Sequence, residues 1–280
     1  MKKDSIKIVK NSGEVVDFSL NKLRQSLERT GADKVTIENI LNTVSLELYQ
    51  GISTKEIYNR AFSLLKKKKS HLASKYKLKK AIYELGPTGF PFERFISAVL
   101  KYSGYKVLVN EILQGKCVSH EIDVVAHKNG NTKIIECKFH GDPGLKCNVK
   151  IPLYIHSRYN DVKEFWNSHP KNGTILNDGW VVTNTRFTED ALKYGECCGL
   201  YLLSWDFPKH DSLKNRIDRL GLYPITVSTL LTKREKQFLL NRNVVLCREL
   251  IDDHFYLDHL GVSEVRKEKI LKEINMLCSK

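Results

Sequence analysis

Residues 120–139 read HEIDVVAHKNGNTKIIECKF, and this stretch decides the fold expected for the middle of the chain. Asn129-Gly130, between two runs rich in β-branched residues, is a strong short-range signal for a β-hairpin. A turn centred on these two residues places Asp123 directly opposite Glu136 on one face of the hairpin. The other face is expected to be apolar and to carry Ile122, Val124, Ala126, Ile135 and Cys137.

The opposed carboxylates of Asp123 and Glu136 are the chemically informative feature of this hairpin. Their Cβ atoms would lie roughly 5 Å apart, and like charges at that spacing destabilise a sheet unless something compensates them. A divalent cation would do so, and carboxylate oxygens suit Mg²⁺ or Mn²⁺. Lys138, expected on the same face, can stabilise charge on a phosphate or orient an attacking water. The alternative is a surface hairpin in which Lys138, opposite Glu121, and solvent balance the acids.

A third acid, Glu93, favours the catalytic interpretation. It lies on a helix expected to begin near Pro91, one residue off the apolar stripe of that helix, so its side chain points along the helix toward the sheet. A third acid beside an opposed pair is costly as structure and useful as a site.

The elements around the hairpin predict an α/β sandwich with a mixed sheet. Residues 87–210 read as a helix, three strands, a helix, a strand, a helix and a last strand. The expected ranges after the first helix are 105–112, 120–127, 132–139, 149–168, 179–184, 188–197 and 199–205.

Asp123 followed by Glu136-Cys137-Lys138 resembles the PD-(D/E)xK nuclease signature. The surroundings resemble the Mrr-like restriction endonuclease family, in Phe92-Glu93 on the leading helix and in the later Val182-Thr183-Asn184. The resemblance covers about residues 88–208 and departs from the pattern at Ile122, where the signature has proline. It implies that Asp123, Glu136 and the carbonyl of Cys137 bind Mg²⁺ or Mn²⁺, that Lys138 is the catalytic lysine, and that Glu93 is the helix acid. DNA is the implied substrate, and Lys150, Arg158 and His140 could line the phosphate path, each with a solvated surface or a capped strand end as the alternative.

Residues 1–86 carry most of the excess positive charge. They hold 18 Lys and Arg against 9 Asp and Glu, whereas the whole chain has a net charge of +14. Such an excess favours a polyanionic ligand. A β-hairpin is expected over residues 6–10 and 14–18, with a turn at Asn11-Ser12-Gly13, followed by four helices. A helix-start signal at Ser53–Glu56 precedes the third helix, and Gly86-Pro87 ends the segment.

This first segment is similar to the ATP-cone module, which binds ATP or dATP as a regulatory ligand. The similarity lies in the hairpin, in Thr54 with Ile57-Tyr58, and in the run from Tyr76 to Pro87. It implies phosphate contacts from lysines, an adenine held by aliphatic side chains, and sensing without hydrolysis, since the chain has no phosphate-binding loop of the Walker type. The implied nucleotide-binding residues are Val9, Lys10, Lys22, Thr54, Tyr58, Lys77 and Lys80. The alternative is a basic helical lobe that contacts DNA phosphates.

Residues 211–280 read as short amphipathic helices. Thr232-Lys233-Arg234-Glu235 predicts a capping box. The stretch from Thr232 to Cys278 resembles a helix-hairpin-helix DNA-binding module, in which the backbone at Gly261 would hold a phosphate. The alternative is a helical lobe used for packing or dimerisation.

Composition limits the remaining possibilities. The chain is 41% hydrophobic, which excludes a disordered protein, and it has neither an apolar run of membrane-spanning length nor a signal-peptide core. Seven cysteines without CxxC spacing indicate reduced thiols in the cytoplasm rather than disulfides or a zinc site.

The sequence therefore predicts an α/β chain of α+β multidomain type, divided at 1–86, 87–210 and 211–280. The expected function is metal-dependent cleavage of DNA, regulated by ATP or dATP, in defence against foreign DNA. A nucleotide-dependent homo-oligomer is a further possibility, and no membrane is expected as a partner. The rivals are a nucleotide-responsive DNA-binding regulator with an inactive nuclease fold, and a structure-specific repair nuclease.

Overall fold

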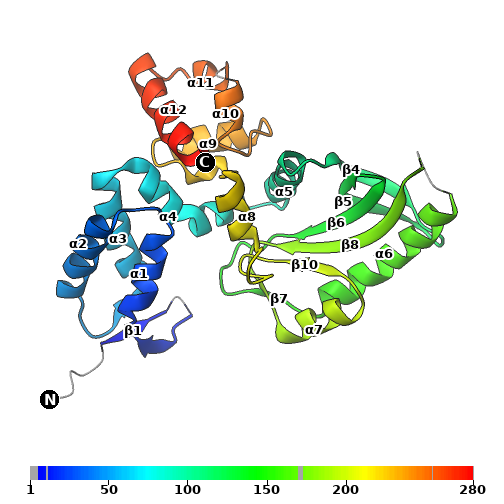
Figure 1. Ribbon diagram of the computed structural model, residues 1–280, viewed down its shortest axis with the longest axis horizontal. Helices are drawn as coiled ribbons and strands as arrows, with labels where there is room; N and C mark the ends of the chain where they lie inside the picture. Colours follow the sequence, from blue (N-terminus) through cyan, green and yellow to red (C-terminus); the bar gives the residue numbers. More distant parts are fainter. Residues whose placement is uncertain (1–5, 11, 170–172, 254, 280) are drawn as a thin grey trace.

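The computed structural model describes residues 6–10, 12–169, 173–253 and 255–279. Figure 1 shows the N-terminal helices and the central sheet on opposite sides of the molecule, with the last helices (orange and red) beside α4 and α8. None of the helices within these described ranges is long and apolar enough to cross a membrane.

The N-terminal part is a small sheet packed on helices. Strands β1 (Lys7–Val9) and β2 (Val15–Asp17) form the expected antiparallel hairpin, and β3 (Ile52–Ser53) pairs with β1 in parallel. Asn11 of the expected turn lies outside the described residues. The third strand was not expected, because its two residues precede a helix cap and are too few to show alternation. Four helices follow in turn: α1 (Leu20–Glu28), α2 (Lys34–Leu46), α3 (Thr54–Lys68) and α4 (Ser70–Tyr83).

The expected helix cap before α3 is half formed. The hydroxyl of Ser53 accepts a hydrogen bond from the Glu56 backbone N–H at 3.1 Å. The Glu56 carboxylate turns away, and accepts from Tyr49 and Arg60. The capping box predicted at Thr232 and Glu235 is complete.

The central part is a five-stranded mixed sheet in the order β10-β8-β6-β5-β4. Strands β4 (Lys106–Gln114), β5 (Ser119–Lys128) and β6 (Asn131–Lys138) are antiparallel, and β8 (Ile175–Thr183) and β10 (Tyr201–Leu203) continue in parallel. Helix α5 (Phe90–Tyr102) packs on one face of the sheet, and α6 (Lys150–Ser168) and α7 (Glu189–Cys197) pack on the other. This architecture confirms the α/β fold class. A two-stranded sheet of β7 (Lys146–Cys147) and β9 (Arg186–Phe187) was not expected.

The hairpin register predicted from Asn129-Gly130 is confirmed between Lys128–Asn131 and Val124–Ile135. The expectation of one apolar face is wrong at Ile122, which packs in the cluster on the α6 side, whereas Val124 packs on the α5 side. The expected pairing of Glu121 with Lys138 is also wrong, because the ladder between β5 and β6 ends at the pair of Val124 and Ile135. The reason is an irregularity opposite Asp123, where Asn110 has a φ of 54° and the β4–β5 ladder skips one pair.

The C-terminal helices share a hydrophobic core with the sheet. One buried cluster runs from the end of α4 through α5 and Trp180 to the last helix, α12 (Glu264–Cys278). A separate cluster holds the N-terminal helices up to Ala73. Helix α4 therefore contributes to both cores. The other C-terminal elements are α8 (Leu213–Leu220), η2 (Ile225–Val227), α9 (Lys233–Leu240), α10 (Glu249–Asp252) and α11 (Phe255–His259).

Candidate functional site

Three acids predicted from different elements meet at one end of the sheet. Glu93 stands in the first turn of α5, Asp123 on β5 and Glu136 on β6. Asp123 accepts a hydrogen bond through Oδ2 from the backbone N–H of Cys137, at 2.7 Å, where the ladder between β5 and β6 ends. We call Glu93, Asp123 and Glu136 the acid cluster. Lys138 lies beside it, with its Nζ 2.5 Å from Oε1 of Glu136.

Two glycines let the start of α5 approach this end of the sheet. A Cβ at Gly86 would lie 2.8 Å from the ring of Phe139, the residue after Lys138. A Cβ at Gly89 would lie 3.0 Å from Oε1 of Glu93. A side chain at Gly86 would meet the Phe139 ring, so the approach of the chain before α5 to the end of β6 depends on this glycine, whereas a side chain at Gly89 would displace the carboxylate of Glu93.

The acid cluster carries more negative charge than its surroundings compensate. Burial, followed by the charges of Asp123 and Glu136, raises the pKa of Glu93 to about 7. Burial and then the charge of Glu136 raise the pKa of Asp123 to about 6, against the opposing effects of the Cys137 N–H, Lys138 and Arg158. For Lys138, burial lowers the pKa, but the hydrogen bond to Glu136 and the nearby acids outweigh it and leave the pKa raised. Raised carboxyl pKa values in a cluster of acids are typical of functional sites.

Arg158 of α6 forms an ion pair with Glu136, which was not expected from the sequence. The sequence had suggested only that Arg158 could line the path of a phosphate. Its Nη1 lies 2.6 Å from Oε2 of Glu136 and 3.1 Å from the carbonyl of Glu121, and its Nη2 donates to Tyr154 at 2.7 Å. The Nε atom is buried and has no hydrogen-bond partner among the described residues. Glu136 thus lies between two cations, Arg158 on one oxygen and Lys138 on the other.

The donor chemistry of the cluster fits a hard divalent cation. Asp123, Glu136 and the Cys137 carbonyl supply the oxygen ligands that Mg²⁺ and Mn²⁺ prefer. In the arrangement seen, the described residues contain no preformed group of three or more His, Cys, Asp or Glu side chains placed to hold a metal. Each oxygen of Glu136 already has a cationic partner, so a bound metal would compete with Lys138 and Arg158 for this carboxylate.

A second site is a cavity of about 660 Å³ beside the N-terminal hairpin, which we call the hairpin cavity. Cations reach it from four segments: Lys10 after β1, Lys79 on α4, Lys146 on β7 and Arg186 on β9. Burial, and then the charge of Arg186, lower the pKa of Lys79. The remaining lining residues are Ser12, Glu14, Thr54, Tyr83, Asp142, Pro143, Gly144, Leu145, Thr185 and Trp205.

The hairpin cavity is linked to the acid cluster through the loop after β6. The hydroxyl of Thr183 donates to the carbonyl of Lys138 at 2.7 Å. Asn184 accepts from the His140 backbone N–H and donates to its carbonyl, both at 2.8 Å. Thr185 and Arg186, the next two residues, line the cavity. The backbone that carries Lys138 is thus held by residues adjoining the cavity wall.

Comparison with known proteins places the chain in a family. The sequence profile of a family described as "AF1548-like, C-terminal" matches residues 223–278. An uncharacterized protein of Archaeoglobus fulgidus is 32% identical over 179 residues, which make up 64% of this chain and 97% of that relative. The chain belongs to the AF1548-like family. A crystal structure titled as that of a protein of unknown function, AF1548, superposes with a TM-score of 0.55 and 29% identity, covering 69% of this chain and 100% of that one.

In this AF1548-like protein the residues expected to bind a nucleotide are divided between two places. Lys10 and Thr54 line the hairpin cavity, and Val9 pairs with Val15 and Ser53 beside it. Tyr58, Lys77 and Lys80 line a different cavity, on the side of α3 and α4 that faces the C-terminal helices. Lys22 is exposed at the start of α1, where its backbone N–H donates to Ser19.

Sequence reasoning missed Lys79, Lys146 and Arg186 in the AF1548-like chain. A helical signal for Lys79 does exist, because Tyr83, four residues on, shares its face and lines the same cavity. Lys146 and Arg186 carry no such signal, since they come from a part of the sequence distant from the hairpin.

Of the other residues predicted to contact DNA, Lys150 and Gly261 are on the surface, and His140 is half-buried. Lys150 is exposed as the first residue of α6. Gly261, with a φ of 65°, is exposed in the turn between α11 and α12. Whether either contacts DNA stays a prediction.

Proposed function

We propose that this protein is a cytoplasmic, metal-dependent deoxyribonuclease regulated by an adenine nucleotide. One observation carries the proposal. Glu93, Asp123 and Glu136 come from three elements and gather beside Lys138 around a place where burial and mutual repulsion raise carboxyl pKa values. A purely structural cluster would be expected to pair each of these acids with a cation, and within the described part of the chain only Glu136 has ion pairs with cations.

Each residue of the site has a role in phosphodiester hydrolysis that its position supports. Asp123, Glu136 and the Cys137 carbonyl would hold Mg²⁺ or Mn²⁺, and the bound ion would polarise a phosphoryl oxygen. Lys138 would orient the attacking water and stabilise charge on the phosphate. Glu93, with a pKa of about 7, can accept or return a proton near neutral pH. Arg158, once released from Glu136, has a planar fork suited to a phosphate.

The proposed regulation uses the hairpin cavity. ATP or dATP would place its phosphates among Lys10, Lys79, Lys146 and Arg186, with Thr54 nearby. The contacts of Thr183 and Asn184 with the Lys138–His140 backbone then offer a route from the nucleotide to the catalytic strand. Binding would change the cleavage rate or the oligomeric state without turnover of the nucleotide.

One specific observation favours a second function, that of a DNA-binding regulator without cleavage. Glu136 is held by both Arg158 and Lys138, an arrangement that neutralises a metal ligand. In such a protein the cations would contact DNA phosphates, and the acids would not bind a metal.

Plasmid cleavage distinguishes the two functions. Wild-type protein is incubated with supercoiled and branched DNA in Mg²⁺ or Mn²⁺, with and without ATP or dATP, beside Asp123→Ala and Glu189→Ala. The control removes an exposed carboxylate from a surface pair with Lys193. The nuclease proposal predicts nicked or linear product from wild type and the control, and none from Asp123→Ala. Retarded but uncut DNA in every metal would instead support the regulator, and preference for branched DNA would identify a repair nuclease.

A further inference from the structure

A cavity of about 240 Å³ lies where α3, α4 and the C-terminal helices meet. Four lysines line it: Lys66 on α3, Lys77 and Lys80 on α4, and Lys236 on α9. We call these four residues the lysine junction. The other lining residues are Tyr58, Asn59, Phe62, Ser228, Thr229 and Leu231. This cavity has no lining residue in common with the hairpin cavity.

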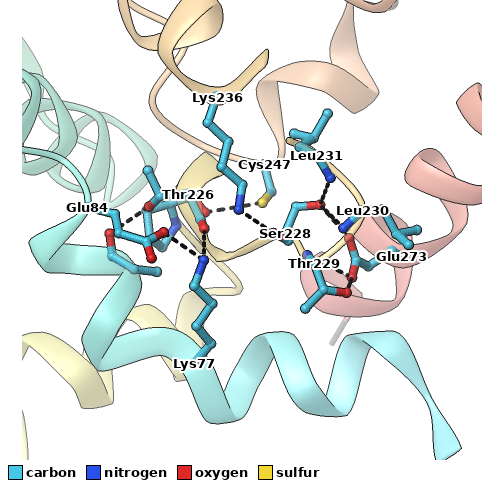
Figure 2. A network of polar contacts seen from close by, with 12 residues as sticks. Lys77, Glu84, Thr226, Ser228, Thr229, Leu230, Leu231, Lys236, Cys247 and Glu273 are labelled. Carbon is cyan, nitrogen blue, oxygen red and sulfur yellow. Dashed lines mark hydrogen bonds and ion pairs between the residues drawn. The ribbon is translucent and has the colours of Figure 1, made fainter. Parts of the chain in front are cut away.

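Two of these lysines come together in the interior. Figure 2 shows Lys77 rising from α4 and Lys236 descending from α9, so that their ammonium groups point toward one another. Lys77 donates to Oε2 of Glu84 at 2.6 Å and to the carbonyl of Thr226 at 3.0 Å. Lys236, only 9% exposed, donates to the carbonyl of Ser228 at 2.5 Å.

The two ammonium groups have more donors than acceptors. Each carries three N–H bonds, six in total. The acceptors that the structure gives them within the described residues are three: Glu84, Thr226 and Ser228. A buried donor without an acceptor costs free energy, so the lysine junction is expected to bind an acceptor group that comes from another molecule.

The charge around the pair is also uncompensated. Lys66 and Lys80 add positive charge to the same cavity, and Lys233 lines an adjoining one of about 610 Å³ that Lys77 and Lys236 also line. Glu84 is the acid in these linings. The nearby carboxylate of Glu273 accepts hydrogen bonds from Ser74, Ser228 and Thr229 and keeps its charge, so the lysines of the two cavities still outnumber the acids around them. Burial and then the charge of Lys77 lower the pKa of Lys236 to about 8.

Tyr58 supplies a further donor. Its hydroxyl is buried and has no hydrogen-bond partner among the described residues, although its ring stacks on Tyr76 with centroids 5.1 Å apart. A phosphate oxygen would satisfy this O–H as well as the ammonium donors.

We propose that the lysine junction binds the phosphate group of a small phosphorylated solute. A phosphate offers several acceptor oxygens and negative charge in one compact group. The four lysines and Tyr58 supply the matching donors and positive charge. The cavity is smaller than the roughly 300–1,000 Å³ typical of drug-sized ligands, so it suits a phosphate or pyrophosphate group rather than a DNA duplex. The bound group would join α3 and α4 to α9 and stabilise the packing of the C-terminal helices.

Thermal unfolding with inorganic phosphate or pyrophosphate tests the proposal in the full chain. Potassium chloride at matched ionic strength serves as the reference. We expect a saturable rise in the Tm, because a ligand that binds only the folded state stabilises it by mass action. An AMP titration distinguishes a phosphate monoester of a nucleotide from the free anion as the source of the group.

Matched lysine variants locate the effect. Lys66→Ala combined with Lys80→Ala removes two exposed lysines of the junction, and Lys67→Ala combined with Lys68→Ala removes two exposed lysines of α3 outside the cavity. We expect the midpoint of the phosphate response to rise at least tenfold in the first variant and to stay unchanged in the second. Tyr58→Phe, which removes only the hydroxyl, should raise it several-fold.

Three results would overturn the proposal. One is a wild-type response no larger than that to potassium chloride, and another is an equal loss in both double variants, which would indicate a general effect of charge. The third is weakened DNA binding in the junction variant with an intact phosphate response, which would make these lysines a DNA surface. This test does not use the cleavage assay, so the phosphate response can be interpreted even if the protein proves not to be a nuclease.

Discussion

The acid cluster and the lysine junction are two places where side chains of one charge gather and where at least two of them are withdrawn from solvent. At the end of β6, Glu136 has two cationic partners, yet Asp123 and Glu93 remain with raised pKa values. Between α4 and α9, and within the described residues, the Lys77 ammonium group has one carboxylate partner and the Lys236 ammonium group has a carbonyl. The same rule, that a buried charge requires a partner, points to a cation in the first place and an anion in the second.

The largest expected effect is at the acid cluster. Asp123→Ala or Asp123→Asn should reduce the single-turnover cleavage rate by about a thousandfold or more, because either change removes a charged ligand worth several kcal/mol to the transition state. Metal affinity, measured by calorimetry, should fall with it. Lys138→Ala should lower the rate comparably while metal still binds. Full cleavage by the Asp123 variants would show that the acid cluster is not a catalytic metal site.

Glu273, close to the lysine junction, is a buried acid whose carboxylate already has hydrogen-bond donors. Its carboxylate, 2% exposed, accepts hydrogen bonds from Ser74, Ser228 and Thr229 and so connects α12 to α4. Glu273→Ala should lower the free energy of unfolding by about 3 kcal/mol, since it leaves several buried donors without an acceptor. Urea unfolding measures this, with the exposed Glu268→Ala on the same helix as control. Equal stability of the two variants would contradict the assignment.

Neighbouring lysines on α4 sharpen the distinction between the two anion sites. Lys79 lines the hairpin cavity and Lys80 belongs to the lysine junction, so α4 contributes a lysine to each of the two sites. Lys79→Ala should weaken ATP or dATP binding about tenfold, or about 1.4 kcal/mol, by removing a charged donor. Lys80→Ala should leave nucleotide affinity unchanged and weaken the phosphate response. Calorimetric titration of both variants would show whether the ligands separate in this way.

The smallest expected effect is on the pH dependence of stability at Glu235, an acid that is paired with Arg266. A hydrogen bond from Arg266 lowers the pKa of Glu235 to about 2, in contrast to the raised value of Asp123. Because the folded pKa lies below the unfolded one of about 4.3, this stability is present above pH 4.3 and is lost as the pH falls toward 2. The carboxylate is partly solvated, so the contribution is about 1 kcal/mol. The unfolding free energy of Glu235→Gln should therefore depend less steeply on pH between 5 and 2 than that of wild type.

The parts of the fold that were predicted correctly depend on local signals. The Asn129-Gly130 turn defines the pairing of β5 with β6, and caps and glycines mark most helix ends within a few residues. The errors at Ile122 and Glu121 arose beyond Val124, where β5 no longer pairs with β6, next to the irregularity around Asn110. An irregularity of this kind depends on the neighbouring strand, so alternation within one hairpin does not reveal it.

The sequence by itself determined the order of the main helices and of the strands of the central sheet, the α/β class and the residues of the acid cluster, because local spacing follows from backbone geometry. Only the tertiary structure decided which cations approach those acids and which lysines converge. Arg158 meets Glu136 from a helix 22 residues further along the chain, and Lys77 meets the Thr226 carbonyl across 149 residues. Charges from distant segments are brought together by the packing of hydrophobic cores, and that packing is a property of the whole chain rather than of any local pattern.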